Sequence, residues 1–306
     1  MKFTLATRGS ALALWQANET KRLLLAAHPD WEVVLHVVQS AGDKDHVTEL
    51  ARFGLTGIFT AEVDHAVLSG AANAGVHSLK DMTTSVHADL MLASTLGRAP
   101  AEDVLVGRNG QKLADLPAGA RVATGSVRRV AMLRALRPDL ELVGIRGNVD
   151  TRIRKLQAGE CDALIMARAG LVRIGLAQHI TEVFDKERFV PAVGQGIVGI
   201  TCRRGDAEAA KALGGIADVE SFAEAMAERS LLHGLHGGCN APVGGHARAA
   251  ENAIVLHARV LSLDGREVIE DRLSGEFEDA ALIGQMLAER LMKRGAKRLI
   301  DAARAS

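Results

Sequence analysis

The sequence predicts an α/β protein made of two doubly wound lobes and a smaller C-terminal α+β domain. Short apolar strands alternate with helices over residues 1–98, and the alternation starts again near residue 121. After residue 241, three strands follow one another without a helix between them. Alternation is typical of a mostly parallel sheet, and successive strands indicate an α+β unit. We expect three domains: residues 1–98 with 192–216, residues 99–191, and residues 217–306.

The first lobe alternates between strand and helix. Ser10 is expected to cap the first helix, because its hydroxyl can accept a hydrogen bond from the first helical turn. Residues 41–57 are polar and contain glycine, which predicts a long functional loop. The expected elements are strands at 3–7, 31–40, 73–77 and 89–96, and helices at 11–27 and 60–68.

The second lobe repeats this pattern, and the C-terminal unit does not. We expect strands at 103–108, 121–124, 141–146 and 162–167, and helices at 126–136 and 149–157. Residues 192–203 are interpreted as one long strand that returns to the first lobe. Helices at 207–213 and 219–235 precede three strands within 241–276, and one amphipathic helix is expected at 279–303.

Positive charge is concentrated in the second lobe. The whole chain has a net charge of zero, yet residues 121–173 hold ten Arg and one Lys against five acidic residues, a net charge of +6. Ser126, Arg128 and Arg129 fall at one strand-to-helix turn, and Arg146 falls at the next. Helix N-termini and arginine forks both favour carboxylates or phosphates. Two such turns indicate an anion site, although a solvated basic face is the simpler alternative.

Polar side chains also end the strands of the first lobe. These residues are Arg8, Ser10, Ser78, Lys80 and Asp81. In a doubly wound sheet, ligands bind at the carboxyl ends of the strands, so this edge is a candidate site.

Composition excludes several other functions. Aromatic residues make up 3% of the chain and Tyr is absent, which argues against nucleic-acid binding. No run of 18 apolar residues and no signal peptide is visible, so we expect neither a membrane span nor export. The three cysteines form no C-x-x-C pair, which argues against a metal site and favours a reducing cytoplasm.

Cys239 follows two glycines and precedes Pro242. Glycine permits a tight turn, and proline prevents a regular element from starting, so the thiol is expected on a loop. Taken alone, a cysteine in such a turn is more often buried and inert. The residues by themselves leave both interpretations open, and Cys161 and Cys202, in apolar surroundings, are expected to be packing residues.

Six short motifs in order give the chain a family resemblance. They are residues 6–10 (Ala-Thr-Arg-Gly-Ser), 75–81 (Gly-Val-His-Ser-Leu-Lys-Asp), 125–129 (Gly-Ser-Val-Arg-Arg), 146–149 (Arg-Gly-Asn-Val), 191–196 (Pro-Ala-Val-Gly-Gln-Gly) and 237–239 (Gly-Gly-Cys). With these motifs the chain resembles the hydroxymethylbilane synthase, or porphobilinogen deaminase, family over nearly its whole length. Each motif alone is weak evidence, whereas six in order are specific.

The resemblance implies a transferase of tetrapyrrole biosynthesis with two periplasmic-binding-protein-like lobes. It implies that four porphobilinogen molecules are joined head to tail, with loss of four ammonia molecules, and that the product is released by hydrolysis. It implies a dipyrromethane cofactor held by a thioether on Cys239, and Asp81 as the catalytic carboxylate that stabilises an azafulvenium cation. It also implies a cytoplasmic monomer without metal.

The resemblance further implies which residues contact the acetate and propionate groups of the pyrroles. Cofactor contacts are expected from Ser78, Lys80, Asp81, Ser126, Arg128, Arg129 and Arg146, and substrate contacts from Arg8, Ser10, Arg146, Arg152 and Arg173. Without the resemblance, Asp81 would be interpreted as a surface cap or as a salt-bridge partner of Lys80.

The sequence also departs from the family pattern. Thr56 and Ala61 stand where lysines are usual, which predicts a modest loss of affinity for an anionic substrate. A binding protein for a small organic anion is the rival function, because two lobes and an arginine cluster would serve it equally well. It would need neither Cys239 on a Gly-Gly loop nor Asp81 beside Lys80.

Overall fold

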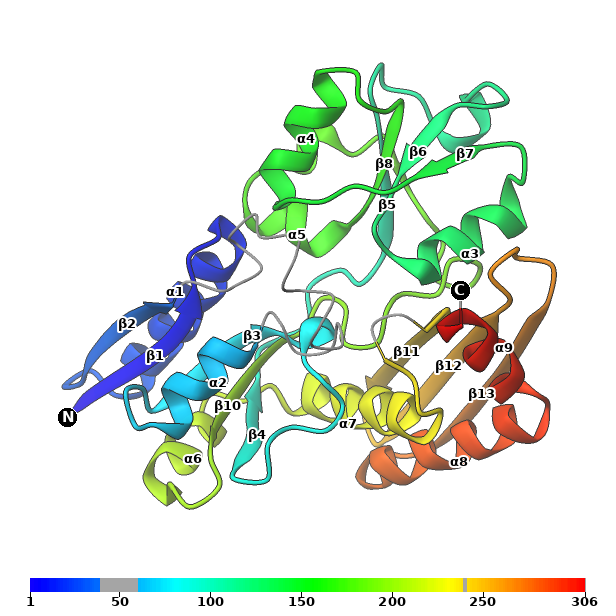
Figure 1. The fold of residues 1–306 in the computed structure, drawn as a ribbon. Coiled ribbons are helices and arrows are strands. Elements are labelled where there is room, and N and C mark those ends of the chain that lie inside the picture. Colours follow the sequence, from blue (N-terminus) through cyan, green and yellow to red (C-terminus); the bar gives the residue numbers. More distant parts are fainter. Residues whose placement is uncertain (39–59, 239–240, 306) are drawn as a thin grey trace. The chain divides into compact units, whose positions relative to one another are not determined.

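The computed structural model describes residues 1–38, 60–238 and 241–305 (Figure 1). The chain forms two compact units, Met1–Arg98 with Ile197–Ala225 and Ala99–Gly196 with Met226–Ser306. Two five-stranded sheets and one three-stranded sheet confirm the predicted α/β class with a C-terminal α+β part. The division into three domains stays a prediction. The expected loop at 41–57, including Thr56, and Cys239 lie outside the described residues.

The first sheet is mostly parallel, as predicted. Its strands are β1 (Lys2–Arg8), β2 (Glu32–Val38), β3 (Ala74–Ser78), β4 (Leu90–Thr95) and β10 (Val198–Arg203), in the order β2-β1-β3-β10-β4. β1 pairs in parallel with β2 and β3, whereas β10 is antiparallel to both of its neighbours. The carboxyl ends of β1 and β3 therefore meet at one edge of the sheet.

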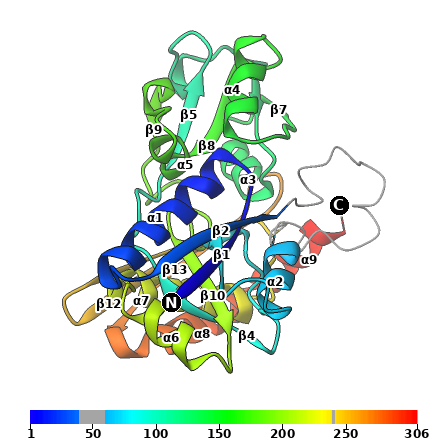
Figure 2. The same ribbon diagram turned by 90° about the vertical axis from the view of Figure 1, so that its left-hand side faces the viewer.

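Helices cover both faces of this sheet. Successive strand residues point to opposite faces, so Leu5 packs with α1 (Ala11–Ala27) and α6 (Ala207–Gly214), and Ala6 packs with α2 (Ala61–Leu68). α1 and α2 lie on opposite sides of β1 (Figure 2). Ser10 caps α1 as predicted, because its Oγ accepts a hydrogen bond of 3.3 Å from the Ala13 amide.

The second sheet repeats this topology. Its strands are β5 (Asp103–Gly107), β6 (Arg121–Ala123), β7 (Glu141–Val143), β8 (Ala163–Ala167) and β9 (Glu182–Val183), in the order β7-β6-β8-β5-β9. β5 is the antiparallel member, like β10 in the first sheet. α3 (Val127–Leu136) packs on one face, and α4 (Val149–Gln157) and α5 (Arg168–Arg173) pack on the other.

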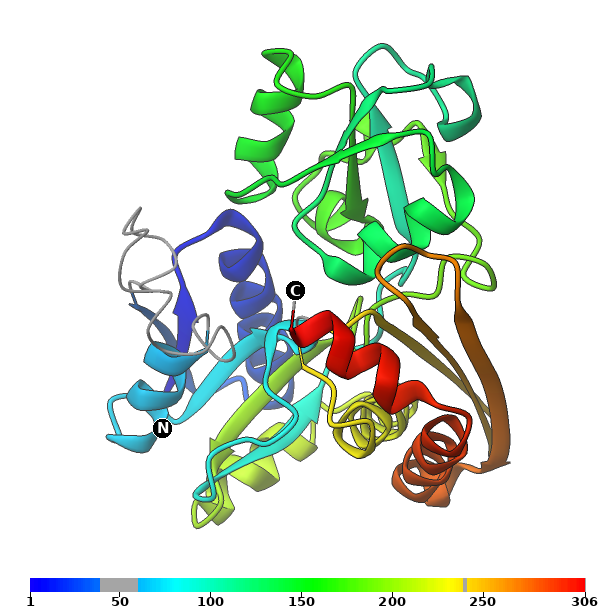
Figure 3. The ribbon, with the colours of Figure 1, turned by 45° about the vertical axis from the view of Figure 1, so that its right-hand side comes forward.

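The C-terminal part is a three-stranded antiparallel sheet with helices. α7 (Val219–Gly234) leads into β11 (Val243–Ala250), β12 (Ala253–Leu261) and β13 (Val268–Glu276). α8 (Ala280–Lys293) and α9 (Ala296–Arg304) follow and lie on the same side of this sheet (Figure 3). Short 3-10 turns occupy Leu79–Asp81, Leu113–Asp115, Ala177–His179 and Phe277–Asp279. Among the described helices, none is both long enough and apolar enough to cross a bilayer.

Two predicted elements differ from the structure because of glycine. The predicted strand at 192–203 exists only as β10, because Gly194 and Gly196 have φ angles of 75° and 89°, which no extended strand contains. The predicted last helix is two helices, because Gly295, with φ of 96°, breaks the helical path between α8 and α9. In addition, β7 ends at Val143 rather than at 146, and α5 and β9 were not predicted.

Candidate active site

The first group of predicted site residues meets at one edge of the first sheet. Arg8 ends β1, Ser78 ends β3, and Ser10 begins α1. Gln16, which belongs to the matching segment Leu14-Trp15-Gln16 of the family resemblance but was given no role in the site, links these elements. Its Nε2 donates to Ser78 Oγ at 2.9 Å, and Ser78 Oγ lies 3.3 Å from Gln16 Oε1. A buried glutamine one turn into α1 thus fixes the serine at the end of β3.

Asp81 and Lys80 sit on a firmly anchored turn. The 3-10 turn Leu79–Asp81 follows β3 directly. The Leu79 amide donates to Ile197 O at 3.0 Å, and the Met82 amide donates to Leu79 O at 3.1 Å. Both apolar side chains are buried in one cluster with Ile197, whereas Asp81 and Lys80 are half-buried. The turn therefore holds a carboxylate and an ammonium group at the strand end, as predicted from the sequence.

A buried polar cluster connects the same strand, β3, with α2 and β10. His77, the residue before Ser78, is 5% exposed, and its Nε2 lies 3.3 Å from Thr201 Oγ1 and 3.4 Å from Asp64 Oδ1. Burial raises the pKa of Asp64 to about 6, although a hydrogen bond from Thr60 and the charge of His87 both oppose the shift.

The raised pKa of Asp64 predicts a pH-dependent stability. The folded pKa lies above the ordinary value of 3.8, so this carboxyl stabilises the fold fully below about pH 4 and loses that effect as the pH rises through about 6. Asp64→Asn cannot ionise. It should raise the free energy of unfolding by about 1–2 kcal/mol at pH 8 and by about half as much at pH 5, where only the unfolded chain is largely ionised.

Urea denaturation of Asp64→Asn and of the parent chain at both pH values measures this difference. Asp30→Asn, at an exposed carboxylate, is the control for the loss of a carboxylate that is not buried. An equal effect of Asp64→Asn at pH 5 and pH 8 would contradict a proton linkage at Asp64.

The second group of predicted site residues lies at the carboxyl ends of β6, β7 and β8. Ser126 caps α3, and its Oγ accepts from the Arg129 amide at 3.5 Å. Arg146 is exposed beyond β7. Gly147, with φ of 109°, turns the chain into α4, and Arg152 Nε donates to its carbonyl at 2.8 Å.

The last member of this group, Arg173, is the final residue of α5. Its Nη2 donates to Gly196 O at 2.7 Å. Burial lowers the pKa of this guanidinium to about 10, so it keeps its charge at neutral pH. A partly desolvated, permanently charged arginine suits a carboxylate ligand.

Arg128 and Arg129 point into the protein rather than out of it. They are 3% and 6% exposed, and both pair with Asp103, which is fully buried. Arg128 Nη1 lies 2.7 Å from Asp103 Oδ2, and Arg129 Nη2 lies 2.6 Å from Asp103 Oδ1. Burial alone would raise the pKa of Asp103, but the two guanidinium groups hold it at about 2. The predicted contact of these arginines with a cofactor stays a prediction.

Asp103 was not selected from the sequence, and Gln195 was noted only as part of the motif 191–196. Gln195 Nε2 donates to Ala101 O at 2.7 Å and to Asp103 Oδ1 at 3.1 Å, so it ties the segment before β5 to the segment before β10. The available signal was an acidic residue at the start of the apolar run 103–107, where a charge must be paired to be tolerated.

The cysteines fall into two classes. Cys161 and Cys202 are buried, as predicted, and burial raises the pKa of both thiols, which makes them poor nucleophiles. Cys239 lies outside the described residues. The chain approaches it from α7, where the Gly237 amide donates to Leu232 O at 2.9 Å and the His236 amide donates to His233 O at 2.8 Å.

These two bonds form a Schellman motif with His236 in the left-handed conformation, at φ of 50°. A Cβ on Gly237 would lie 2.4 Å from Leu232 Cδ1, so a larger residue here would displace the Leu232 side chain. The amide of this first glycine of the Gly-Gly-Cys motif fixes the path of the chain as it leaves α7.

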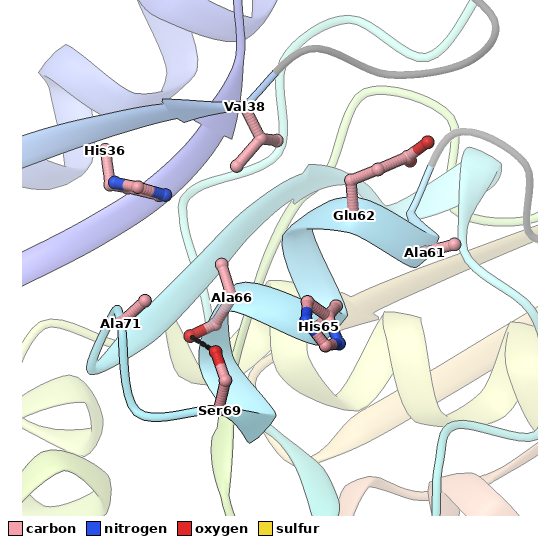
Figure 4. A pocket seen from close by; sticks show the side chains of 8 residues that line it. All are labelled: His36, Val38, Ala61, Glu62, His65, Ala66, Ser69 and Ala71. Atoms are coloured by element: carbon pink, nitrogen blue, oxygen red, sulfur yellow. Dashed lines mark hydrogen bonds between the residues drawn. The ribbon is translucent and has the colours of Figure 1, made fainter.

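A cavity of about 500 Å³ in the first unit involves none of the predicted site residues. It lies between β2 and α2 and is lined by His36, Val38, Ala61, Glu62, His65, Ala66, Ser69 and Ala71 (Figure 4). Charged side chains at strand ends, rather than this cavity, mark the candidate site, because ligands of doubly wound sheets bind at the carboxyl ends of the strands.

Comparisons with known proteins agree with the motifs. Residues 3–211 match the family model "Porphobilinogen deaminase, dipyromethane cofactor binding domain", and residues 222–293 match "Porphobilinogen deaminase, C-terminal domain". The porphobilinogen deaminase of Syntrophobacter fumaroxidans is 39% identical over 97% of this chain and 96% of its own length. That of Nitratiruptor sp. is 41% identical over 100% and 98%. The periplasmic aliphatic sulphonate binding protein of Escherichia coli aligns with 77% of this chain and 70% of its own at 17% identity, with a TM-score of 0.42.

Proposed function

The chain belongs to the porphobilinogen deaminase family, and on that premise we propose that it joins porphobilinogen units with Asp81 as the catalytic carboxylate. It is a transferase of tetrapyrrole biosynthesis that condenses four porphobilinogen molecules, releases four ammonia molecules and hydrolyses the product to hydroxymethylbilane. The full-length match carries this conclusion. The anchored turn Leu79–Asp81 supports the part given to Asp81.

The residues present fit a dipyrromethane cofactor. Its acetate and propionate groups need donors that stay charged in a partly desolvated place. Arg128 Nε is buried without a hydrogen-bond partner among the described residues, and Arg146 is exposed. We propose Ser126, Arg128, Arg129 and Arg146 as cofactor ligands in the second unit, and Ser78, Lys80 and Asp81 in the first. When bound, the cofactor supplies the pyrrole to which the first substrate is joined.

Cys239 is the proposed point of attachment. Of the three cysteines, Cys161 and Cys202 are buried with raised thiol pKa values, and neither can reach a bulky group without opening its core cluster. Elimination and the Gly-Gly-Cys motif both support Cys239.

Asp81 acts on the charge that develops when ammonia leaves porphobilinogen. That charge resides on the pyrrole, whose N–H can donate to a carboxylate. A carboxylate held on an anchored turn needs no reorganisation as the charge appears, and this is the usual source of a large electrostatic effect. The same carboxylate is placed to hold the pyrrole proton. Lys80, Arg8, Ser10, Arg152 and Arg173 are proposed to bind the acetate and propionate groups and orient the ring.

The purified chain tests this function directly. Incubated with porphobilinogen, it should release ammonia and form hydroxymethylbilane, and its intact mass should exceed the sequence mass by one dipyrromethane. A binding protein for an organic anion would retain porphobilinogen but release no ammonia and gain no covalent mass. That outcome would contradict the proposed function. The cytoplasmic location, the monomeric state and the absence of nucleic-acid partners stay predictions.

A further inference from the structure

Asp103 is the buried centre of an ion-pair cluster with Arg128 and Arg129, and the proposed reaction assigns Asp103 no role. It begins β5, has no exposed surface, and pairs with Arg128 and Arg129 at 2.7 and 2.6 Å. Gln195 Nε2 donates to the same carboxylate at 3.1 Å. Asp103 belongs to none of the motifs that indicate catalysis, and it would contact neither substrate nor cofactor from this position.

Charge explains why a carboxylate stands here. Two guanidinium groups and one carboxylate leave the cluster with a net charge of +1. Without Asp103, two nearly buried positive charges would face each other, which burial makes very unfavourable. With Asp103 present, a single positive charge remains in the cluster, and this charge can be balanced by one carboxylate group of a ligand but not by two.

The contacts of the two arginines show which of them can bind a ligand. Each nitrogen of the Arg129 guanidinium group has a polar contact. Nε donates to Asp103 Oδ1 at 2.9 Å, Nη1 donates to Ile165 O at 2.9 Å, and Nη2 lies 3.5 Å from Gln195 Oε1. Within the part of the chain that the structure describes, the Arg128 guanidinium makes its polar contacts through Nη1, which donates to Val190 O at 2.7 Å and pairs with Asp103, and the group lies over the Phe189 ring, with Cζ 5.8 Å from the ring centroid. Its Nε is buried without a partner among the described residues.

We propose that Asp103 is a positioning residue for the cofactor. It fixes the guanidinium groups of Arg128 and Arg129, so that the remaining N–H donors of Arg128 bind one carboxylate group of the dipyrromethane. This inference rests on the proposed function. It differs from a purely structural ion pair because it predicts an effect on cofactor binding in a chain that is already folded.

Asp103→Asn tests the proposal, because it keeps the shape of the side chain and removes the charge. The matched control is Glu224→Gln, which breaks another largely buried pair, Arg98 Nη1 to Glu224 Oε2 at 3.1 Å, in the first compact unit. Both chains are produced without cofactor and checked by circular dichroism at a temperature where they are folded. They are then incubated with porphobilinogen while intact mass spectrometry follows the gain of dipyrromethane.

Asp103→Asn should gain the cofactor at least about tenfold more slowly than the parent chain, since one charged contact is worth roughly that factor. Glu224→Gln should lose thermal stability but gain cofactor at the parental rate. If Asp103→Asn does not fold, Gln195→Met decides, because it keeps all three charges of the cluster and removes the amide that donates to Asp103. This variant should fold and gain cofactor several-fold more slowly.

Parental uptake by folded Asp103→Asn, or by Gln195→Met where it is needed, would overturn the proposal. Equally slow uptake by Glu224→Gln would also overturn it, because uptake would then report stability alone. A parent chain that gains no dipyrromethane would instead contradict the proposed function, so the two failures are distinguishable.

Discussion

Asp81→Asn should turn over porphobilinogen ~100-fold more slowly than the parent chain, or slower still. The substitution keeps the shape of the side chain and removes its charge. If Asp81 acts mainly on the cation that develops as ammonia leaves, the loss will appear in kcat far more than in KM. The fold should be unchanged, because Leu79 and Met82 anchor this turn and Asp81 is only half-buried.

Asp81→Glu is the matched variant, because it keeps the charge and moves it by one methylene group. It should retain weak activity, above that of Asp81→Asn. Ammonia release measures turnover, circular dichroism checks the fold, and intact mass checks that cofactor is present. An Asp81→Asn chain that folds, carries cofactor and works at a near-parental rate would show that Asp81 is structural.

Cys239→Ser should carry no stable dipyrromethane and form no detectable hydroxymethylbilane. A serine hydroxyl is far less acidic than a thiol and is a much weaker nucleophile without a neighbouring base. The intact mass of the variant should therefore equal the sequence mass after incubation with porphobilinogen, whereas the parent chain gains one dipyrromethane.

Cys161→Ala and Cys202→Ala are the controls for this experiment. Both thiols are buried in core clusters, so each change removes one small buried group and should cost about 1 kcal/mol of stability. Both variants should still gain the cofactor mass. A dipyrromethane found on Cys161 or Cys202, or a fully loaded Cys239→Ser chain, would disprove the assignment of Cys239.

Most elements were predictable because periodicity and caps mark them locally. Ser10 and Ser126 both cap helices where their sequence positions suggest, and β1, β3 and β8 follow the apolar runs. The strand-end position of Asp81 was predictable for the same reason, since a polar turn follows a buried strand.

The orientation of Arg128 and Arg129 was not predictable from local pattern. Both lie at a helix N-terminus, which favours anions, so the sequence predicts that their side chains face an anionic ligand. The structure points them at Asp103, more than twenty residues earlier in the chain, because a fully buried carboxylate at the start of β5 must be paired. Only long-range packing determines this choice.

The sequence analysis did not predict the backbone turns at which a single glycine interrupts an otherwise regular pattern. Residues 192–197 are apolar enough for a strand, and residues 279–303 are periodic enough for one helix. Gly194, Gly196 and Gly295 adopt positive φ angles in these segments, and composition does not reveal which glycines will do so.

The antiparallel strand β10 determines when the first sheet can be completed during protein synthesis. It lies between β3 and β4, so those two strands remain unconnected until residues 198–203 have left the ribosome. The second sheet draws all of its strands from residues 103–183 and needs nothing from later in the chain. Because the chain is made from its N-terminus, the first sheet starts before the second sheet and is completed after it. In the nascent chain, the backbone N–H and C=O groups of β3 and β4 that pair with β10 remain unpaired while about a hundred intervening residues are translated.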